Sequence, residues 1–260
     1  MINEKFLESR MDSIIGTKAA MNITVINGTE QKGCTYAMKE MFLDTVGRGN
    51  TITEFYLPRD CPEFCIGCKA CFNKDISVCP HSRYIVPIWN AVSAADLLVF
   101  TSPVYAFHVT AQMKALLDHF CTKWMAHSPE KQMFGKQAVI ITNSAGAGMK
   151  NVIKDIGDSL RYWGVARVFS IKQGLFGASW EKVTAKRKAN IKRQCENVCR
   201  RLKPQETVKP GIGIKGRFYI MRMAQKMIHK DLQKKGEPET ADHIHWKKNG
   251  WLDGKKPWRD

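Results

Sequence analysis

The fold is decided by the stretch Asn22-Ile23-Thr24-Val25-Ile26-Asn27-Gly28-Thr29-Glu30-Gln31-Lys32-Gly33-Cys34-Thr35. Its first six residues form a short apolar run rich in β-branched side chains, which predicts a strand. Gly28 ends this run, and a helical pattern of apolar residues follows from Tyr36 to Val46. A strand that passes into a helix through a loop with two glycines is the start of a β-α-β unit. The stretch therefore predicts an α/β protein.

The same pattern of a strand followed by a helix recurs as far as residue 202. Further strands are predicted at 51–57, 96–101, 137–142 and 166–171, and helices at 84–95, 108–124, 151–163 and 180–202. Apolar strands that alternate with helices form a parallel sheet covered on both faces. Such a sheet binds ligands at the carboxyl ends of its strands, where the strand order switches. We therefore expect a three-layer α/β/α sandwich whose site lies in the loops after the strands.

The loop after the first predicted strand has the composition of an anion site. Gly28 and Gly33 allow a ligand to approach the backbone closely, and Thr29 and Thr35 offer hydroxyl groups. The start of the helix adds amide N–H groups and the positive end of the helix dipole. The loop lacks the G-x-G-x-x-G and G-x-x-x-x-G-K-[ST] patterns, which disfavours a dinucleotide site or a P-loop. Taken alone, the loop is also compatible with an ordinary turn.

Two later loops, 101–108 and 143–148, have the composition of a site for a flat ring. The first contains Pro103, Tyr105 and Phe107, a stiff turn whose aromatic side chains can stack on a planar heterocycle. The second is rich in small residues and exposes backbone N–H and C=O groups. Either loop alone could be packing at the edge of the core. Together with the anion loop, they predict a site for a mononucleotide with a flat base.

Four cysteines after the second predicted strand have the spacing of metal ligands. The segment Cys65-Ile66-Gly67-Cys68-Lys69-Ala70-Cys71 places three thiols at intervals of three positions, and Cys79-Pro80 completes the set. Four thiolates spaced in this way can hold a [4Fe–4S] cluster, and zinc is a second candidate. Cys61 is a spare ligand or a bystander. We expect the remaining cysteines to be packing thiols, namely Cys34, Cys121, Cys195 and Cys199.

These motifs resemble the flavodoxin-like NAD(P)H-dependent FMN reductases, a family that includes the iron–sulfur flavoproteins. The resemblance covers about residues 21–202. It rests on the first loop, the cysteine motif, residues 142–148, and Ser102-Pro103-Val104-Tyr105 followed by Lys114 and Asp118. It implies noncovalently bound FMN, a five-stranded parallel sheet of order 2-1-3-4-5, and a homodimer or tetramer. In many such reductases the cysteine loop covers the flavin and binds no metal. For this chain, a metal-free loop is therefore a third alternative to an iron–sulfur cluster and to zinc.

By this resemblance, three sets of residues would bind FMN. The phosphate would lie at the loop of Thr29, Gln31, Gly33, Cys34 and Thr35. The isoalloxazine ring would lie against Pro103, Val104, Tyr105 and Phe107, with its pyrimidine side toward Asn143, Ser144, Ala145, Gly146 and Gly148. The usual family form has Ser-Pro-Arg after the first glycine, whereas this chain has Thr29-Glu30-Gln31. An arginine contact is therefore missing, and Glu30 must point away from the phosphate.

The resemblance implies an oxidoreductase that takes electrons from NAD(P)H and passes them through FMN to a small acceptor, such as a flavin or a quinone. The alternative is an iron–sulfur flavoprotein that carries electrons between proteins. A flavin supplies the reactive centre itself, so no acid, base or nucleophile has to be assigned. Tyr105 and His108 are the candidates for donating a hydrogen bond to the ring or to a substrate.

The positive charge of the chain is concentrated in its tail. Residues 181–260 carry 22 Lys and Arg against 9 Asp and Glu, which accounts for +13 of the total of +17. We expect an N-terminal extension, an FMN-binding domain and a basic C-terminal extension, over 1–20, 21–202 and 203–260. The basic extension would comprise a linker, a helix over 217–235 and a segment with three tryptophans that packs or caps a pocket.

Nucleic acid or an anionic membrane could bind this basic extension, but docking on its own or a partner subunit is favoured. A third class of function, a basic binding module with a vestigial flavin fold, follows from the same charge. No apolar run approaches the ~20 residues of a bilayer span, and the first twenty residues lack the apolar core of a signal peptide. The expectation is a cytoplasmic protein, in which nine cysteines favour metal or redox chemistry over disulfides.

Overall fold

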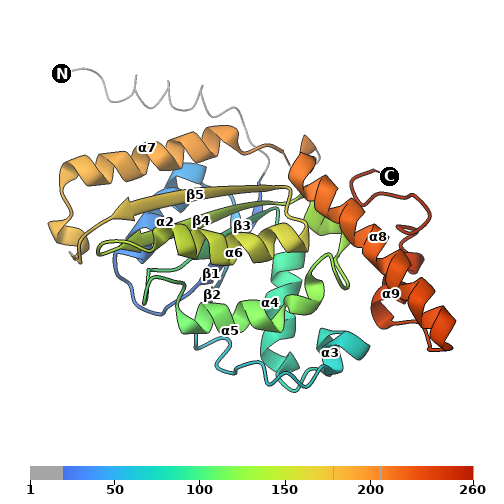
Figure 1. Cartoon of the computed structure of the whole chain (residues 1–260). Coiled ribbons are helices and arrows are strands. Elements are labelled where there is room, and N and C mark those ends of the chain that lie inside the picture. Colours follow the sequence, from blue (N-terminus) through green and yellow to red (C-terminus); the bar gives the residue numbers. More distant parts are fainter. Residues whose placement is uncertain (1–19, 178, 205–206, 260) are drawn as a thin grey trace.

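The computed structural model describes residues 20–177, 179–204 and 207–259, which form a parallel sheet between two layers of helices (Figure 1). The strands are β1 (Asn22–Asn27), β2 (Thr51–Tyr56), β3 (Leu97–Thr101), β4 (Gln137–Ser144) and β5 (Arg167–Gly174). The α-helices are α2 (Cys34–Val46), α3 (Ala70–Asn73), α4 (Ser82–Ala94), α5 (Ala111–His119), α6 (Met149–Trp163), α7 (Ala185–Arg201), α8 (Ile212–Lys235) and α9 (Ala241–Lys248). Short 3-10 turns are η1 (Ile76–Val78), η2 (Cys121–Lys123), η3 (Lys131–Gly135) and η4 (Trp180–Lys182). The expected N-terminal extension, except for its last residue, lies outside the described residues.

The five strands are all parallel and follow the order β2-β1-β3-β4-β5, which confirms the expected flavodoxin-like sheet. The register places Asn27 beside both Tyr56 and Thr101, and Thr101 beside Ile141. The carboxyl ends of the central strands are therefore level with one another. The strand order reverses between β1 and β3, which is the switch point at which this architecture binds ligands.

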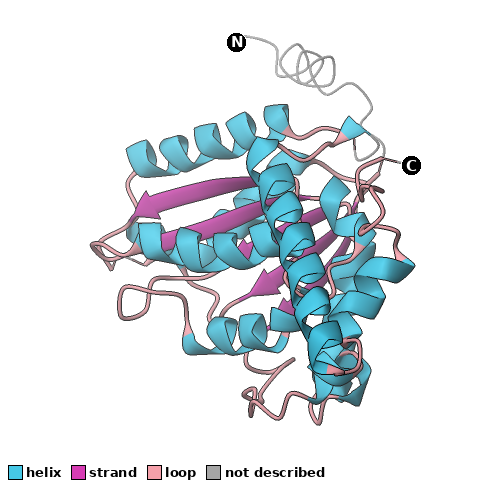
Figure 2. Cartoon of the chain, turned by 45° about the vertical axis from the view of Figure 1, so that its right-hand side comes forward, coloured by secondary structure: helices cyan, strands magenta, loops and turns pink. Residues whose placement is uncertain are grey.

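Both faces of the sheet are covered by helices, as Figure 2 shows. In β3, Leu97 and Val99 join the hydrophobic cluster that contains residues of α2 and α7. Leu98 and Phe100 join the cluster on the other face, with residues of α4, α5 and α6. Successive side chains of a strand point to opposite faces, so a strand covered on both sides needs an apolar residue at every position. This requirement explains the continuous apolar runs in the sequence.

Two helices are shorter than the sequence predicted. The helix expected over 108–124 is only α5, because the Thr110 hydroxyl accepts the N–H of Met113 and caps the helix there. The helix expected over 180–202 is a 3-10 turn followed by α7, which Thr184 caps in the same way. A threonine hydroxyl that satisfies a first-turn amide fixes the start of a helix. The apolar pattern alone did not show these starts.

The basic extension forms two helices that pack on the connection leading into β4. Figure 1 shows α8 and α9 at the end of the sheet opposite the tip of β5. The helix α8 begins at Ile212, inside the segment expected to be a linker, because Ile214 and Phe218 are buried. Phe218 stacks on Trp246 with ring centroids 4.9 Å apart, and both belong to a cluster that includes Phe134. The apolar contacts of this cluster override the helix-breaking glycines of the segment.

Polar contacts reinforce the docking of α8 and α9. The side-chain amide of Gln225 donates to the carbonyl of Ala126 at 2.8 Å, and the indole N–H of Trp246 donates to the carbonyl of His127 at 2.8 Å. His127 also pairs with Asp242, with Nδ1 and Oδ2 2.8 Å apart. The segment with three tryptophans therefore packs against the rest of the chain, which is one of the two roles expected for it. No described helix combines the length and the apolar character that a bilayer crossing requires.

Candidate functional site

Hydrogen bonds tie the loops after β1, β3 and β4 to one another at the carboxyl edge of the sheet. The N–H of Gly28 donates to the carbonyl of Thr101 at 2.7 Å, and the Thr110 hydroxyl donates to the carbonyl of Gly28 at 2.6 Å. A Cβ at Gly28 would lie 2.8 Å from the Thr101 oxygen, so this approach requires glycine. The N–H of Val104 donates to the carbonyl of Asn143 at 3.0 Å. We call residues 28–35, 103–110 and 143–148 the strand-end cradle.

The first loop of the cradle leads into a helix start that no side chain caps. The helix α2 follows Gly33, which has no side chain, and its first turn contains no acidic residue. Glu30 turns away, because its carboxylate accepts the N–H of Arg59 at 3.0 Å. The hydroxyl of Thr29 accepts the N–H of Gln31 at 3.2 Å and shapes the loop. An uncapped helix start of this kind suits a phosphate group, through its amide groups and dipole.

Thr35 joins the first loop to the third. Its hydroxyl donates to Oδ1 of Asn143 across a short contact between α2 and β4. The hydroxyl that the sequence offered to a phosphate is therefore engaged inside the protein. The backbone amides at the start of α2, and not this hydroxyl, are the better donors for an anion.

A buried charge network lies directly before the cradle loops. Nζ of the fully buried Lys39 lies 2.6 Å from Oε2 of Glu54, and the amide of Asn27 donates to the same oxygen at 2.8 Å. The hydroxyl of Thr101 donates to Oδ1 of Asn27 at 3.3 Å. Burial raises the pKa of Glu54, but hydrogen bonds from Lys39, Asn27 and Tyr56 outweigh burial and hold that pKa below its usual range. The network joins the ends of β2, β1 and β3.

The second loop holds two aromatic side chains outward on a strained backbone. Tyr105 and His108 exchange two backbone hydrogen bonds of 3.0 and 2.9 Å, which makes a tight turn. Between them, Ala106 and Phe107 have φ angles of 45° and 68°. Such angles are costly for residues other than glycine and concentrate at functional sites. Tyr105 and Phe107 are 49% and 62% exposed, and His108 is turned toward α6 by a 2.9 Å contact with Asp155.

The third loop packs closely against the second. Gly148 has a φ of 95°, and a Cβ there would lie 2.6 Å from Cγ1 of Val104 and 2.8 Å from Cα of Phe107. Only glycine fits this position. Before it, Ala145 and Gly146 are exposed, so their backbone groups form an accessible rim. Sheet register and loop contacts thus bring an anion donor, an aromatic wall and a backbone rim to one edge.

The cysteine loop, defined as residues 61–81, follows β2. Cys65 and Cys68 are exposed, whereas Cys71 and Cys79 pack partly buried against the core. Burial raises the pKa of Cys71, and the nearby Cys79, Cys65 and Cys68 raise it further. Burial also raises the pKa of Cys121 to about 11, with smaller contributions from Cys71 and Cys65. Cys121, expected to be a packing thiol, therefore borders the same group of thiols.

The family of the chain follows from comparison with known proteins. The sequence profile of the NADPH-dependent FMN reductases matches residues 21–178. The chain belongs to this family. An iron–sulfur flavoprotein of Methanocaldococcus jannaschii is 24% identical over 175 residues, which span 64% of this chain and 85% of the relative. An iron–sulfur flavoprotein of Archaeoglobus fulgidus is 22% identical over 231 residues, which span 86% of this chain and 94% of the relative.

Solved structures share the fold of this FMN reductase family member. The NAD(P)H:quinone oxidoreductase of Methanothermobacter marburgensis superposes with a TM-score of 0.54 at 16% sequence identity. The superposition covers 72% of this chain and 98% of the quinone oxidoreductase. Family membership makes the chain an oxidoreductase that uses FMN and NAD(P)H. The cradle fits FMN, because it offers uncapped amides for a phosphate and exposed aromatic rings for a flat heterocycle.

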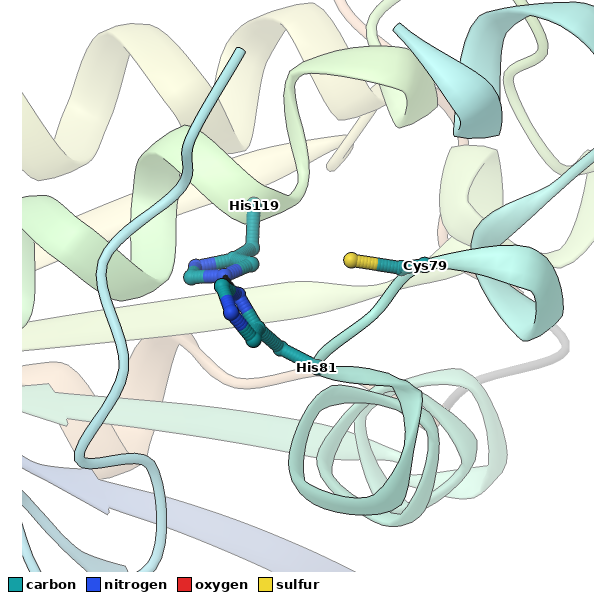
Figure 3. Close-up of side chains that lie close together, drawn as sticks. All are labelled: Cys79, His81 and His119. Atoms are coloured by element: carbon teal, nitrogen blue, oxygen red, sulfur yellow. Dashed lines mark hydrogen bonds between the residues drawn. The ribbon is translucent and has the colours of Figure 1, made fainter. Parts of the chain in front are cut away.

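Three residues were missed from the sequence, one at this edge and two beside the cysteine loop. Thr110 ties the loops after β1 and β3, and only its position before an apolar helix hinted at a cap. His81 and His119 lie beside Cys79, and Figure 3 shows the three side chains turned toward one another. The adjacent Cys79-Pro80-His81 could have drawn attention to His81. Nothing in the sequence pointed to His119, because α5 brings it from forty residues further along the chain.

Proposed function

We propose that this FMN reductase family member passes electrons from NAD(P)H through FMN to a small acceptor, such as a free flavin or a quinone. The strand-end cradle is the observation that supports the proposal. Its loops are fixed to one another by backbone hydrogen bonds, and its aromatic side chains remain exposed to a ligand. A rigid, open platform suits a reaction in which the protein mainly positions a cofactor and its partners.

In this proposal, each part of the cradle has one task toward FMN. The amides at the start of α2, with Thr29 and Gln31, hold the phosphate. Pro103, Val104, Tyr105 and Phe107 lie along the isoalloxazine ring, and the rim at 143–148 meets its pyrimidine edge. When bound, FMN supplies the hydride and electron transfer. The Tyr105 hydroxyl and the His108 ring are the side chains that can hydrogen-bond the ring or an acceptor.

The balanced reaction is the transfer of two electrons from NAD(P)H to the acceptor. NAD(P)H gives up a hydride and leaves as NAD(P)⁺, and a quinone takes up two electrons and two protons, one of which comes from solvent. The test measures FMN per chain in the purified protein, and then NAD(P)H oxidation with a quinone or a free flavin. We expect one FMN per chain and acceptor-dependent oxidation. A colourless protein that cannot be reconstituted with FMN would contradict the proposal.

A second candidate function is electron transfer between proteins by an iron–sulfur flavoprotein. Its support is the cysteine loop, in which Cys79, Cys65 and Cys68 lie near enough to Cys71 to raise the pKa of that thiol, together with the names of the two relatives. Such a protein would hold a [4Fe–4S] cluster on these four thiolates. Anaerobic purification with iron and sulfide analysis tests the cluster. Four iron and four sulfide per chain, with fast ferredoxin exchange and no NAD(P)H oxidation, would favour the carrier over the reductase.

We also propose that the protein forms a homo-oligomer through the edge that carries the cradle. Large apolar side chains are exposed on the loops after β2 and β3, the two strands that flank β1, at Phe64 and Ile66 and at Tyr105 and Phe107. Exposed apolar residues that gather in one region mark interaction surfaces. Light scattering of the FMN-loaded protein should give a dimer or a tetramer, and Phe64→Glu with Ile66→Glu should shift it toward monomer. A monomer in the unsubstituted protein would refute this assignment.

A further inference from the structure

Three metal-binding side chains from separate parts of the fold meet at the end of the cysteine loop. Cys79 follows the turn η1, His81 is the residue before α4, and His119 is the last residue of α5. One ligand atom from each lies within 4.8 Å of the others. The three side chains point toward one another (Figure 3). Nδ1 of His81 is 3.0 Å from Nε2 of His119. A tetrahedral zinc ion with Zn–N bonds of about 2.0–2.1 Å would hold two nitrogens about 3.3 Å apart.

The two imidazole rings are oriented for a common ligand. Their planes are 66° apart, so the ring planes, which contain the nitrogen lone pairs, cross each other. His119 is buried, with 3% of its surface exposed, and its Nδ1 lies 2.9 Å from the carbonyl of Ala115. That contact requires Nδ1 to carry the proton and leaves the lone pair of Nε2 directed at His81. A ligand histidine typically donates its second ring N–H to a carbonyl in this manner.

A second group of histidines in the same chain lacks this orientation. His229, Glu239 and His243 also bring ligand atoms within 4.8 Å of one another. The rings of His229 and His243, however, are stacked 3.7 Å apart at an angle of 11°. Nearly parallel ring planes do not cross close to the nitrogens, so one ion cannot lie in the plane of both rings. In addition, Lys247 is bonded to Glu239 at 3.2 Å. The second group is therefore a natural control for the first.

We propose that Cys79, His81 and His119 bind one divalent cation of the zinc class. A thiolate and two imidazoles are ligands that zinc prefers, and three protein ligands leave a fourth position for water. The ion would fasten the cysteine loop to the start of α4 and the end of α5. This inference does not depend on FMN binding. It competes with the cluster proposal, because Cys79 cannot serve both metals at once.

Binding has a defined proton balance. The Cys79 thiol loses its proton to solvent when the thiolate binds the ion. In neutral His81, the proton moves from Nδ1, where it faces His119, to the other ring nitrogen. One proton is therefore released for each ion bound at a pH where both histidines are neutral. The alternative structure is a plain hydrogen bond from His81 to His119, which releases no proton and binds no metal.

The experiment titrates the full-length, FMN-loaded protein with Zn²⁺ after treatment with a chelator. We expect one Zn²⁺ per chain and one proton released per ion. Zinc-edge X-ray absorption should find one sulfur at about 2.3 Å and two nitrogens at about 2.0–2.1 Å. A coordination sphere of sulfur alone, or the same binding with and without His81, would overturn the proposal.

Matched variants separate this site from its alternatives. Since loss of a residue that merely orients a ligand weakens metal binding about 10–100-fold, His81→Ala should weaken it on the order of 100-fold or more. His229→Ala should leave it unchanged. Cys65→Ser with Cys68→Ser should also leave it unchanged, although that pair would destroy a [4Fe–4S] cluster. His119→Gln serves as a second test, and retained FMN content in each variant shows that the protein has folded. The proposal is wrong if the double variant Cys65→Ser with Cys68→Ser loses both zinc and reconstituted iron while His81→Ala keeps both. In that case the cysteine loop holds a cluster.

Discussion

The strand-end cradle and the cysteine loop both follow strands of the sheet, but they differ in the hydrogen bonds that hold them. The cradle is held by long-range bonds, such as those from Thr110 to Gly28 and from Val104 to Asn143. The hydrogen bonds of the cysteine loop are mostly local, as from Phe72 to Lys69 and from Lys74 to Ala70. The cradle offers few reactive side chains and loops bonded to one another, whereas the cysteine loop offers many thiols and few hydrogen bonds to other parts of the chain. A cofactor of defined shape needs the former, and a metal ion can organise the latter.

The largest effect is expected at Gly148, where two cradle loops touch. Gly148→Ala adds a Cβ that meets Val104 at 2.6 Å and the backbone of Phe107 at 2.8 Å, at a φ of 95°. The second loop must move, so we expect FMN to bind about 100-fold more weakly, which is about 2.7 kcal/mol. Fluorescence titration of the apoprotein with FMN measures this. Gly47→Ala is the control, because Gly47 has a φ of 101° but open space around it. Equal FMN affinity in both variants would mean that the cradle is not rigid.

The next effect is expected in the charge network before the cradle. Lys39→Met leaves Glu54 without its cation, and we expect the free energy of unfolding to fall by about 2 kcal/mol at pH 7. This is below the ~3–5 kcal/mol of a fully buried pair, because the Glu54 side chain is 24% exposed. Denaturant unfolding of both proteins measures the difference. The exposed pair of Lys154 and Asp158 gives a control, since Lys154→Met should change stability by less than about 0.5 kcal/mol.

The pH dependence of that difference has a defined sign. Because the folded protein lowers the pKa of Glu54, this carboxylate stabilises the fold at pH values above its ordinary range. The contribution is lost as the pH falls through the lowered pKa and Glu54 takes up a proton. The gap between the parent protein and Lys39→Met should therefore shrink on acidification. A gap that widens in acid would show that Lys39 acts through packing and not through charge.

A smaller effect is expected where Thr35 joins the first and third loops. Thr35→Val keeps the shape of the side chain but removes the hydrogen bond to Asn143. A bond of this kind contributes about 1 kcal/mol, which corresponds to about fivefold weaker FMN binding. Thr45→Val is matched on the same helix, because Thr45 bonds only to the carbonyl of Met41 one turn before it. If both variants bind FMN equally, Thr35 has no part in setting the cradle.

The smallest effect is expected in the cysteine loop. Cys65→Ser with Cys68→Ser alters two exposed side chains, so stability should change by less than about 0.5 kcal/mol. FMN should be retained, since the cradle forms without these thiols. Iron analysis of the same variant reports whether they hold a cluster. Loss of FMN together with iron would show that the loop is a third wall of the flavin site, and the contrast between the two regions would disappear.

Particular residues show how far sequence reasoning reached. The apolar residues Leu97 to Phe100 predicted a strand covered on both faces. Successive side chains of a strand point to opposite faces, so an unbroken apolar run indicates that both faces are buried. Glu30 was expected to point away from the anion loop, and it bonds to Arg59. The Thr110 cap and the start of α8 at Ile212 were missed. The cap is a local contact between Thr110 and Met113 that the apolar pattern does not register, whereas the start of α8 depends on packing against distant residues such as Phe134 and Trp246.

The sequence by itself determined the strand-and-helix alternation, the family and the loops that follow the strands. These depend on local composition and on spacing along the chain, which a sequence displays directly. Only the tertiary structure decided that Gly148 must be glycine, that Thr35 bonds to Asn143, and that His119 reaches Cys79. Each of these contacts joins segments far apart in sequence, and the sheet register and helix packing set their distances. The stretch from Asn22 to Thr35 thus predicted an edge for a nucleotide, and the folded chain determined which atoms form it.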